Sequence, residues 1–291
     1  MKIEIFTFIS GDTADYAEFL KDTADRTCSG KHELIWKCIE SLNVTRLPNG
    51  IKCVGKTGGE NEHASMKHAI AVHKALEMIE NDFVLFVDAD IAIVYKNWDQ
   101  VIIDNLKKYH CFGGAYPVAN DKITNSRYRN FPRINFFAFR KDVLNKVKID
   151  FSPFKDKKRT VFRSYITKKD SKIVELPPKS LFSHDIGWQL PFIFKRNNLT
   201  YNYMPCYLGS SKHIKLPFLN KDDKKISIEK SRTMEEFHYN NKLFALHKKW
   251  GRNNILNGKF GLSWKKRVES YIKQEVGAGM EKKNRLIYKE E

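Results

Sequence analysis

Two acidic residues placed two positions apart carry the strongest chemical signal in the sequence. Asp88 and Asp90 directly follow the apolar run FVLFV at residues 83–87. In extended chain, side chains two residues apart project to the same side, so the two carboxylates would be crowded together. A divalent ion such as Mg²⁺ or Mn²⁺ would neutralise them, and these ions also bind phosphate oxygens. The pair therefore predicts a cation and phosphate site, the alternative being one helix-capping Asp and one solvated Asp.

The elements that would position this pair alternate between strands and helices. Period-two and continuous apolar patterns predict strands over residues 2–9, 33–39, 51–55, 83–87, 111–117, 135–139 and 201–205. Helical spacing predicts helices over residues 12–25, 62–80, 235–250 and 262–275, and another that starts near Asp185. The basic stretch 155–172 is expected to be a loop. Such alternation indicates an α/β fold with a doubly wound sheet, in which ligands bind beyond the carboxyl ends of strands.

Charge divides the chain into two parts. The formal net charge is +18, yet residues 1–105 hold 11 Lys and Arg against 17 Asp and Glu. The remaining residues hold 41 basic and 17 acidic side chains. This asymmetry indicates either a polyanionic partner for the second part or a set of solvated lysines. We expect one continuous domain, with an acidic half at 1–105 and a basic half at 106–291.

The cysteines and the apolar segments bear on where the protein works. The five cysteines form no CxxC pair, which argues against a zinc ribbon or a disulfide framework and suits a reducing cytosol. No signal peptide is recognised, and no apolar stretch has the length of a membrane-spanning helix. The expected location is cytoplasmic, or peripheral at the inner membrane surface.

Six strings along the chain carry a family resemblance. They are KIEIFTFIS, ENEHASMKHAIAVHKALE, FVLFVDADIAIV, FPRINFFAFRKDVL, SHDIGWQLPF and LFALHKKWG. In this order the sequence resembles GT-A glycosyltransferases of the bacterial and viral kind, which carry an Asp-x-Asp motif. The resemblance implies the GT-A fold, a single Rossmann-like mixed sheet flanked by helices, here with a basic C-terminal helical annex. It also implies a nucleotide-sugar donor, expected to be a UDP-sugar, and Mn²⁺ or Mg²⁺. The half at 1–105 would then be the nucleotide-sugar-binding half, and the half at 106–291 the acceptor-binding half.

The resemblance assigns roles to individual residues. The residues implied to contact the nucleotide sugar are Thr7, Phe8, Ile9, Ser10, Ser65, His68 and Asp88. The residues implied to bind the cation are Asp88, Asp90 and His247, and His213 is the alternative histidine ligand.

A catalytic base would also be needed if the sugar is transferred with inversion. Asp185 in SHDIGW matches the acidic residue near the acceptor and would take the proton from the acceptor hydroxyl. Its alternative role is to cap the following helix, and the neighbouring His184 could serve as base instead.

The acceptor is inferred from the basic second half. Aromatic residues are interleaved there with cations, namely Tyr128, Phe131, Phe154, Phe162 and Tyr165 among Lys155, Lys157, Lys158, Arg159 and Arg163. Cations neutralise phosphates, and aromatic rings stack on an unstacked base. A hydroxylated base in phage-type DNA is therefore the first candidate for the acceptor. A glycan, a lipid-linked glycan or an anionic lipid surface is the alternative, since most GT-A enzymes use such acceptors.

Three other classes fit the sequence less well. In haloacid dehalogenase phosphatases the Asp-x-Asp motif opens the domain and continues to Thr or Val, whereas Ala92 stands here. Sugar nucleotidyltransferases carry a Gly-rich basic loop after the first strand, which ISGDTADYAEF lacks. A non-catalytic polyanion-binding module would need neither a divalent ion nor a nucleotide sugar.

Overall fold

The computed structural model describes ten stretches of the chain. They are residues 1–11, 13–40, 44–57, 64–117, 130–153, 163–166, 173–176, 186–208, 234–248 and 264–274. None of the helices within these stretches has both the length and the apolar character needed to cross a bilayer.

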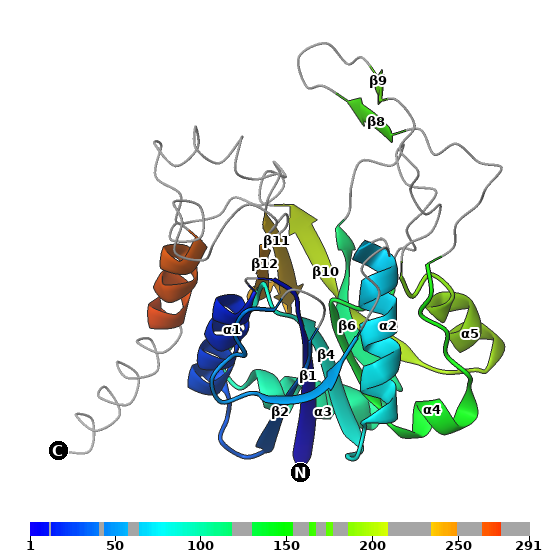
Figure 1. Cartoon of the computed structure of the whole chain (residues 1–291), viewed down its shortest axis with the longest axis horizontal. Helices are drawn as coiled ribbons and strands as arrows, with labels where there is room; N and C mark the ends of the chain where they lie inside the picture. The colour runs from blue at the N-terminus through cyan, green and yellow to red at the C-terminus, as the bar shows by residue number, and fades with distance from the viewer. Residues whose placement is uncertain are drawn as a thin grey trace.

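Ten strands form one mixed sheet (Figure 1). They are β1 (Lys2–Ile9), β2 (Glu33–Glu40), β3 (Lys52–Lys56), β4 (Phe83–Asp88), β5 (Ile91–Ile93), β6 (Cys111–Pro117), β7 (Phe136–Arg140), β10 (Tyr201–Leu208), β11 (Met234–Tyr239) and β12 (Lys242–Lys248). Their order is β3-β2-β1-β4-β7-β6-β10-β11-β12-β5. A separate two-stranded sheet pairs β8 (Arg163–Ile166) with β9 (Ile173–Leu176).

Strand direction changes once the sheet passes β4. The first four strands in spatial order, β3, β2, β1 and β4, run parallel. Beyond them β7 is antiparallel to both β4 and β6, and β10, β11, β12 and β5 are joined by antiparallel pairs. The predicted α/β class with a mixed, helix-flanked sheet is therefore confirmed.

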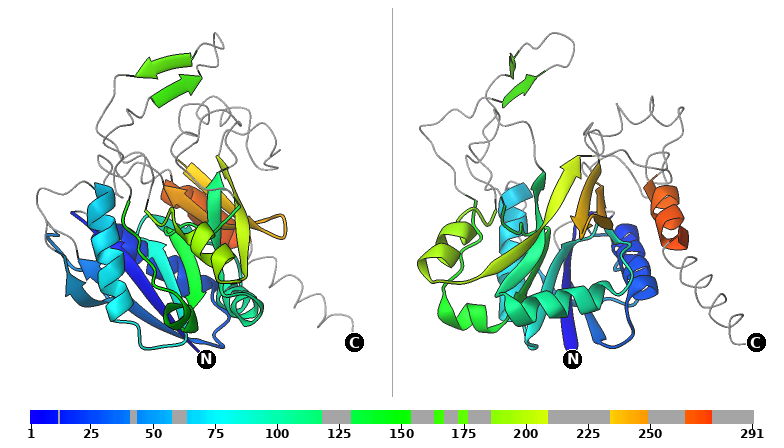
Figure 2. Two further views of the ribbon diagram at one scale, coloured as in Figure 1. Left: turned by 90° about the vertical axis from the view of Figure 1, so that its right-hand side faces the viewer. Right: turned by 180° about the vertical axis from the view of Figure 1, so that it is seen from behind.

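Helices cover both faces of the sheet. They are α1 (Ala14–Thr27), α2 (Ala64–Glu77), α3 (Trp98–Lys108), α4 (Asp142–Lys146), α5 (Leu190–Arg196) and a helix over residues 264–274. The helix over 264–274, drawn in orange, lies beside α1 on one side of the sheet, and α2 and α5 lie on the other (Figure 2). Side chains of α1, α3 and the 264–274 helix join one core cluster, and those of α2 and α5 join a second.

Strand β4 shows why the sheet is covered on both faces. Val84, Leu85, Phe86 and Val87 are all fully buried. Leu85 and Val87 belong to the first core cluster, whereas Val84 and Phe86 belong to the second. Alternate residues of a strand point to opposite faces, so a continuous apolar run of this kind requires packing on both sides.

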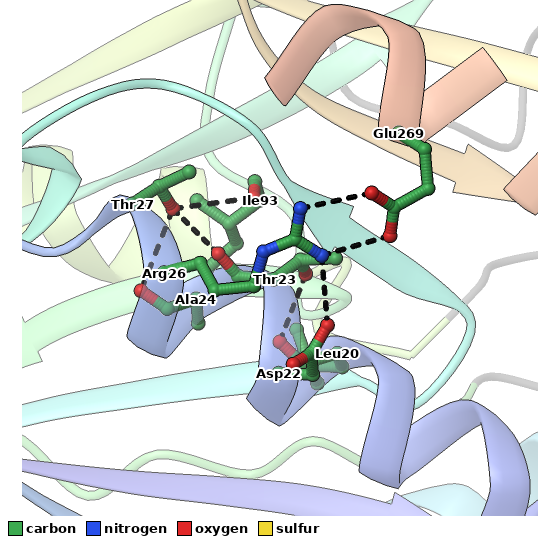
Figure 3. Close-up of polar contacts among 8 residues, drawn as sticks. All are labelled: Leu20, Asp22, Thr23, Ala24, Arg26, Thr27, Ile93 and Glu269. Carbon is green, nitrogen blue, oxygen red and sulfur yellow. Dashed lines mark hydrogen bonds and ion pairs between the residues drawn. The ribbon is translucent and has the colours of Figure 1, made fainter. Parts of the chain in front are cut away.

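The 264–274 helix is held against α1 by one ion pair and one aromatic anchor. Arg26 donates two hydrogen bonds to the carboxylate of Glu269, each 2.8 Å long (Figure 3). The Trp264 ring is nearly fully buried and packs edge-on against Phe19 at a centroid distance of 5.3 Å. The helix predicted over 262–275 is thus present and docked.

One predicted helix is wrong. Residues 235–250 were expected to be helical, but within them β11 and β12 form an antiparallel hairpin. Asn240 and Asn241 connect the strands, both with positive φ, 48° and 60°. Two left-handed residues make the two-residue turn that suits the twist of a hairpin. The sequence also gave no hint of α3, and residues 163–166 are a strand within the expected loop.

Candidate metal centre

Asp88 and Asp90 lie where β4 ends and the chain turns into β5. Backbone hydrogen bonds fix the turn on both sides: the Asp88 N–H donates to the Asn135 carbonyl, and the Lys248 N–H donates to the Asp90 carbonyl, each at 2.9 Å. The two carboxylate side chains are each 24% exposed. They are therefore held at a fixed position and remain within reach of a ligand from solvent.

His247 is brought to this turn by strand pairing. In the antiparallel pair of β12 with β5, His247 lies opposite Ile91, the residue after Asp90. Its Nε2 lies 3.3 Å from Oδ1 of Asp90. Asp88, Asp90 and His247 each offer one ligand atom, and these three atoms lie within 4.8 Å of one another. Two carboxylate oxygens and one imidazole nitrogen are a donor set that suits Mn²⁺ and, less strongly, Mg²⁺.

His68 and Phe8 lie on the neighbouring side of Asp88. His68, on α2, places Nε2 3.4 Å from Oδ1 of Asp88. Its ring meets the Phe8 ring edge-on at a centroid distance of 5.0 Å. Phe8 is in turn the register partner of Asp88 in the parallel pair of β1 with β4. The structure thus gathers Phe8, His68 and Asp88 at one corner of the sheet.

The other residues predicted to contact the nucleotide lie nearby on β1 and α2. Thr7 and Ile9 are buried in β1, so neither side chain is exposed to a ligand from solvent. Ser10 is exposed just beyond β1, and its N–H donates to Oγ1 of Thr13 at 2.8 Å. Ser65 is half-buried in the first turn of α2. Their roles toward a nucleotide stay predictions.

The electrostatics of the centre reflect burial and the close approach of like charges. Burial raises the pKa of Asp88; His68 opposes this rise, and the neighbouring Asp90 adds to it. Burial alone would lower the pKa of His247, but the carboxylates of Asp90 and Glu235 outweigh it and raise this pKa to about 9. Both shifts indicate that negative charge is concentrated at this centre.

Several neighbours of the centre carry charge that the sequence had not singled out. Glu235 contacts the far nitrogen of His247, and Arg133 forms an ion pair with Glu235. Lys248 donates a hydrogen bond to the Tyr16 hydroxyl, and burial together with Asp90 raises the pKa of Tyr16 to about 12. Arg133 stands in FPRIN and Lys248 in LFALHKKWG, two strings that carried the family resemblance without suggesting these roles.

Other predicted residues lie outside the described stretches. Asp185, His184 and His213 are among them, as are Tyr128, Phe154, Phe162 and most of the interleaved cations. Phe131 is described and is fully buried, in contact with the Phe194 ring at 5.1 Å between centroids. Phe131 is thus a core residue, and the proposed base and acceptor platform stay predictions from the sequence.

Comparison with known proteins gives similarities in structure only. The sequence matches no protein-family model and no curated protein. The bifunctional IspDF from Campylobacter jejuni is 17% identical, with 50% of this chain and 42% of that chain covered and a TM-score of 0.34. A protein from STIV is 12% identical, with 87% and 98% covered and a TM-score of 0.35.

Sugar transferases are also among the similar structures. The mannosyltransferase PcManGT from Pyrobaculum calidifontis, in complex with GDP-Man and Mn²⁺, is 14% identical, with 49% of this chain and 45% of that chain covered and a TM-score of 0.36. The chain thus spans less than half the length of that enzyme and of IspDF. Identities and scores at this level carry no inference about function, which must rest on the side chains around Asp88, Asp90 and His247.

Proposed function

We propose that this chain is a metal-dependent glycosyltransferase that moves a sugar from a nucleotide-sugar donor to a hydroxyl of an anionic acceptor. The observation that supports the proposal most is the convergence of Asp88, Asp90 and His247, whose ligand atoms lie within 4.8 Å of one another. His247 is on β12, Asp88 is the last residue of β4, and Asp90 lies in the turn between β4 and β5. Two crowded carboxylates at this edge of a sheet form a site for a divalent cation and the phosphates it binds.

The proposed reaction leaves negative charge on the departing nucleoside diphosphate. Mn²⁺ or Mg²⁺ at this centre would stabilise that charge as a Lewis acid. Asp88 and Asp90 would hold the cation through carboxylate oxygens, and His247 through Nε2. Phe8 and His68, at the same corner of the sheet, would contact the donor. Asp185 remains our proposed base for the acceptor hydroxyl in an inverting reaction.

For the acceptor we keep the order that the charge pattern suggests. The surplus of cations after residue 105 favours a polyanion, and we place a hydroxylated base in DNA first. A glycan or a lipid-linked glycan at a membrane surface is the second candidate. Binding to duplex DNA that falls steeply with added salt would favour the first. Tight binding to anionic vesicles, with weak DNA binding even at low salt, would favour the second.

A thermal-shift panel tests the proposal directly. UDP-, GDP- and CMP-sugars are added to the protein with Mn²⁺ or with EDTA, and the best donor is then used in transfer assays on hydroxymethylated DNA and on glycans. We expect one donor class, UDP-sugars first, to raise Tm only when Mn²⁺ is present, because a bound ligand stabilises the folded state. A panel in which no nucleotide sugar changes Tm would contradict the proposal.

A matched pair of variants separates the site from general charge effects. Asp88→Asn removes a proposed ligand at the end of β4, whereas Asp82→Asn removes an exposed carboxylate just before the same strand. The Mn²⁺-dependent shift should be lost in Asp88→Asn and kept in Asp82→Asn. Equal shifts in both variants would remove Asp88 from the proposed centre.

A further inference from the structure

The hairpin of β11 and β12 places Glu235 directly opposite His247. Near the turn, Tyr239 pairs with Lys242 and His238 with Leu243, but Phe237 pairs with Ala245. Phe244 is thus the extra residue of a β-bulge, and its carbonyl accepts hydrogen bonds from the N–H groups of Val94 and Tyr95, at 3.0 and 3.2 Å. The bulge shifts the register by one residue, and this shift makes Glu235 the partner of His247.

Glu235 and its neighbours form a buried chain of charges behind His247. Oε2 of Glu235 lies 2.9 Å from Nδ1 of His247, and Arg133 forms an ion pair with the same carboxylate oxygen. Glu235 is fully buried, and Arg133 and His247 are 5% and 8% exposed. The guanidinium of Arg133 also lies over the Phe237 ring at 5.1 Å. Arg133 thus compensates the charge of Glu235 at the oxygen that also contacts the histidine.

The contact with Glu235 determines which nitrogen of His247 is directed at the acidic pair. A carboxylate only accepts hydrogen bonds, so Nδ1 must carry the proton that joins it to Glu235. A protonated Nδ1 cannot accept from the Asn135 side-chain amide, whose Nδ2 lies 3.3 Å away while its buried Oδ1 has no hydrogen-bond partner. Turning this amide over would let Oδ1 accept from Nδ1 as well. Nε2 is left to face Asp90 at 3.3 Å.

We propose that Glu235, compensated by Arg133, is a positioning residue that holds His247 with Nδ1 protonated and Nε2 directed at the Asp88–Asp90 centre. The proposal rests on the proposed function in one respect, namely that Nε2 serves as a ligand to the cation. Outer partners of this kind orient a histidine and raise its basicity as a ligand, and their loss weakens metal binding about 10- to 100-fold.

The test compares wild-type protein with the double variant Arg133→Met/Glu235→Met. Both members of the buried ion pair are replaced together, because removal of one alone would leave an unpaired buried charge and endanger folding. Two readouts are used: Mn²⁺ affinity by calorimetric titration, and the Nδ1 proton of His247 in spectra of ¹⁵N-histidine-labelled protein, assigned by its loss in His247→Gln. Should the double variant not fold, Glu235→Gln replaces it in both measurements.

The same strand offers a matched control. Glu236 is also buried and pairs with Arg267 at 2.5 Å, but it contacts His238 rather than His247. Arg267→Met/Glu236→Met removes an equivalent carboxylate–guanidinium pair away from the proposed centre. This variant should keep wild-type Mn²⁺ affinity and the His247 Nδ1 signal, whatever its effect on stability.

The outcomes separate this inference from the proposed function. We expect the double variant at Arg133 and Glu235 to lose the protected Nδ1 proton and to bind Mn²⁺ about 10- to 100-fold more weakly. Retention of that proton, or Mn²⁺ affinity within about twofold of wild type, would overturn the inference. If wild-type protein binds no Mn²⁺, the proposed function fails. In that case the presence of the His247 Nδ1 proton signal in wild type and its loss in the double variant still show whether Glu235 positions His247.

Discussion

Two buried charge clusters in the same sheet serve different purposes. One joins Glu4 of β1 to Lys37 of β2, near the ends of the strands where the chain enters the sheet. The other lies behind the turn that follows β4 and contains Arg133, Glu235 and His247. Each buries one carboxylate completely and extends to carboxylates that reach solvent. In the first, the Glu80 side chain that pairs with Lys37 is 74% exposed, and in the second Asp88 and Asp90 are each 24% exposed.

The Glu4 cluster is closed by its own hydrogen bonds. The Glu4 carboxylate lies 2.5 Å from the ammonium of Lys37, and Oε2 accepts the N–H groups of Glu80 and Asn81, each at 2.9 Å. Lys37 also donates to the Met78 carbonyl at 3.2 Å. A buried charge that is paired and hydrogen-bonded in this way tethers the loop before β4 to β1. Lys37 also pairs with the exposed carboxylate of Glu80 at 3.0 Å, so its ammonium lies between two carboxylates.

The comparison teaches how a buried charge can be structural or functional. In the Glu4 cluster both the buried Glu4 carboxylate and the exposed Glu80 carboxylate contact the ammonium of Lys37. At the proposed centre, Arg133 and Glu235 balance each other, whereas Asp88 and Asp90 face one another at the surface end of the chain of contacts. The unbalanced carboxylates are therefore the ones we expect to bind a cation, and the balanced pair behind them gives rigidity.

Breaking the closed cluster should cause the largest loss of stability. Lys37→Met leaves Glu4 buried without its cation, and we expect the free energy of unfolding to fall by about 3–5 kcal/mol. Urea denaturation followed by circular dichroism measures this change. In the double variant Glu4→Met/Lys37→Met most of the loss should be recovered. If Lys37→Met is as stable as wild type, the pair does not contribute to folding.

Breaking the open centre should instead cost activity. Asp90→Asn is expected to lower turnover by roughly 10²–10³-fold, because a charge that stabilises the leaving group is no longer held in place. The urea midpoint in the absence of metal should stay near that of wild type. Asp104→Asn, which removes an exposed carboxylate on α3, is the control and should retain full turnover. Wild-type turnover of Asp90→Asn in EDTA would refute a role for the cation.

The turn of the hairpin links stability to the open centre. Asn240 has φ of 48°, a conformation that Asn tolerates but that Val does not. Asn240→Val should lower the free energy of unfolding by about 1–2 kcal/mol, whereas Asn240→Gly should be close to neutral. Thermal unfolding compares the two variants. Because β5 also pairs with β12, the register of the hairpin should survive in Asn240→Gly, and this variant should bind Mn²⁺ with wild-type affinity. An altered Mn²⁺ affinity in Asn240→Gly would show that the turn alone sets the register.

The smallest effect concerns pH and again belongs to the closed cluster. Burial tends to raise the pKa of Glu4, but Lys37 and the N–H groups of Asn81 and Glu80 outweigh it, so this pKa lies below its ordinary value of 4.5. A lowered pKa contributes stability above the unfolded value, and that stability is lost as pH falls through the folded value. Urea midpoints from pH 6 down to pH 3 should therefore fall less steeply in Glu4→Gln than in wild type. Parallel curves would contradict the lowered pKa.

The sequence by itself determined the features that depend on neighbouring residues. The run Phe83–Val87 predicted a strand covered on both faces, with Asp88 and Asp90 at its end. The strands β1, β2 and β6 and the helix over 264–274 were likewise predicted from the spacing of apolar residues within each segment. The hairpin was missed because helical spacing was favoured at 235–250, although Asn240-Asn241 between apolar runs is itself a turn signal.

Only the tertiary structure decided which distant residues meet the acidic pair. His247 reaches Asp90 because β5 pairs with β12 at one end of the sheet order, a pairing between segments remote in sequence. Glu235 faces His247 because the Phe244 bulge shifts the hairpin by one residue, and Arg133 reaches Glu235 from the segment before β7. Strand register is set by packing and by hydrogen bonds to other segments, and local sequence patterns do not encode these contacts.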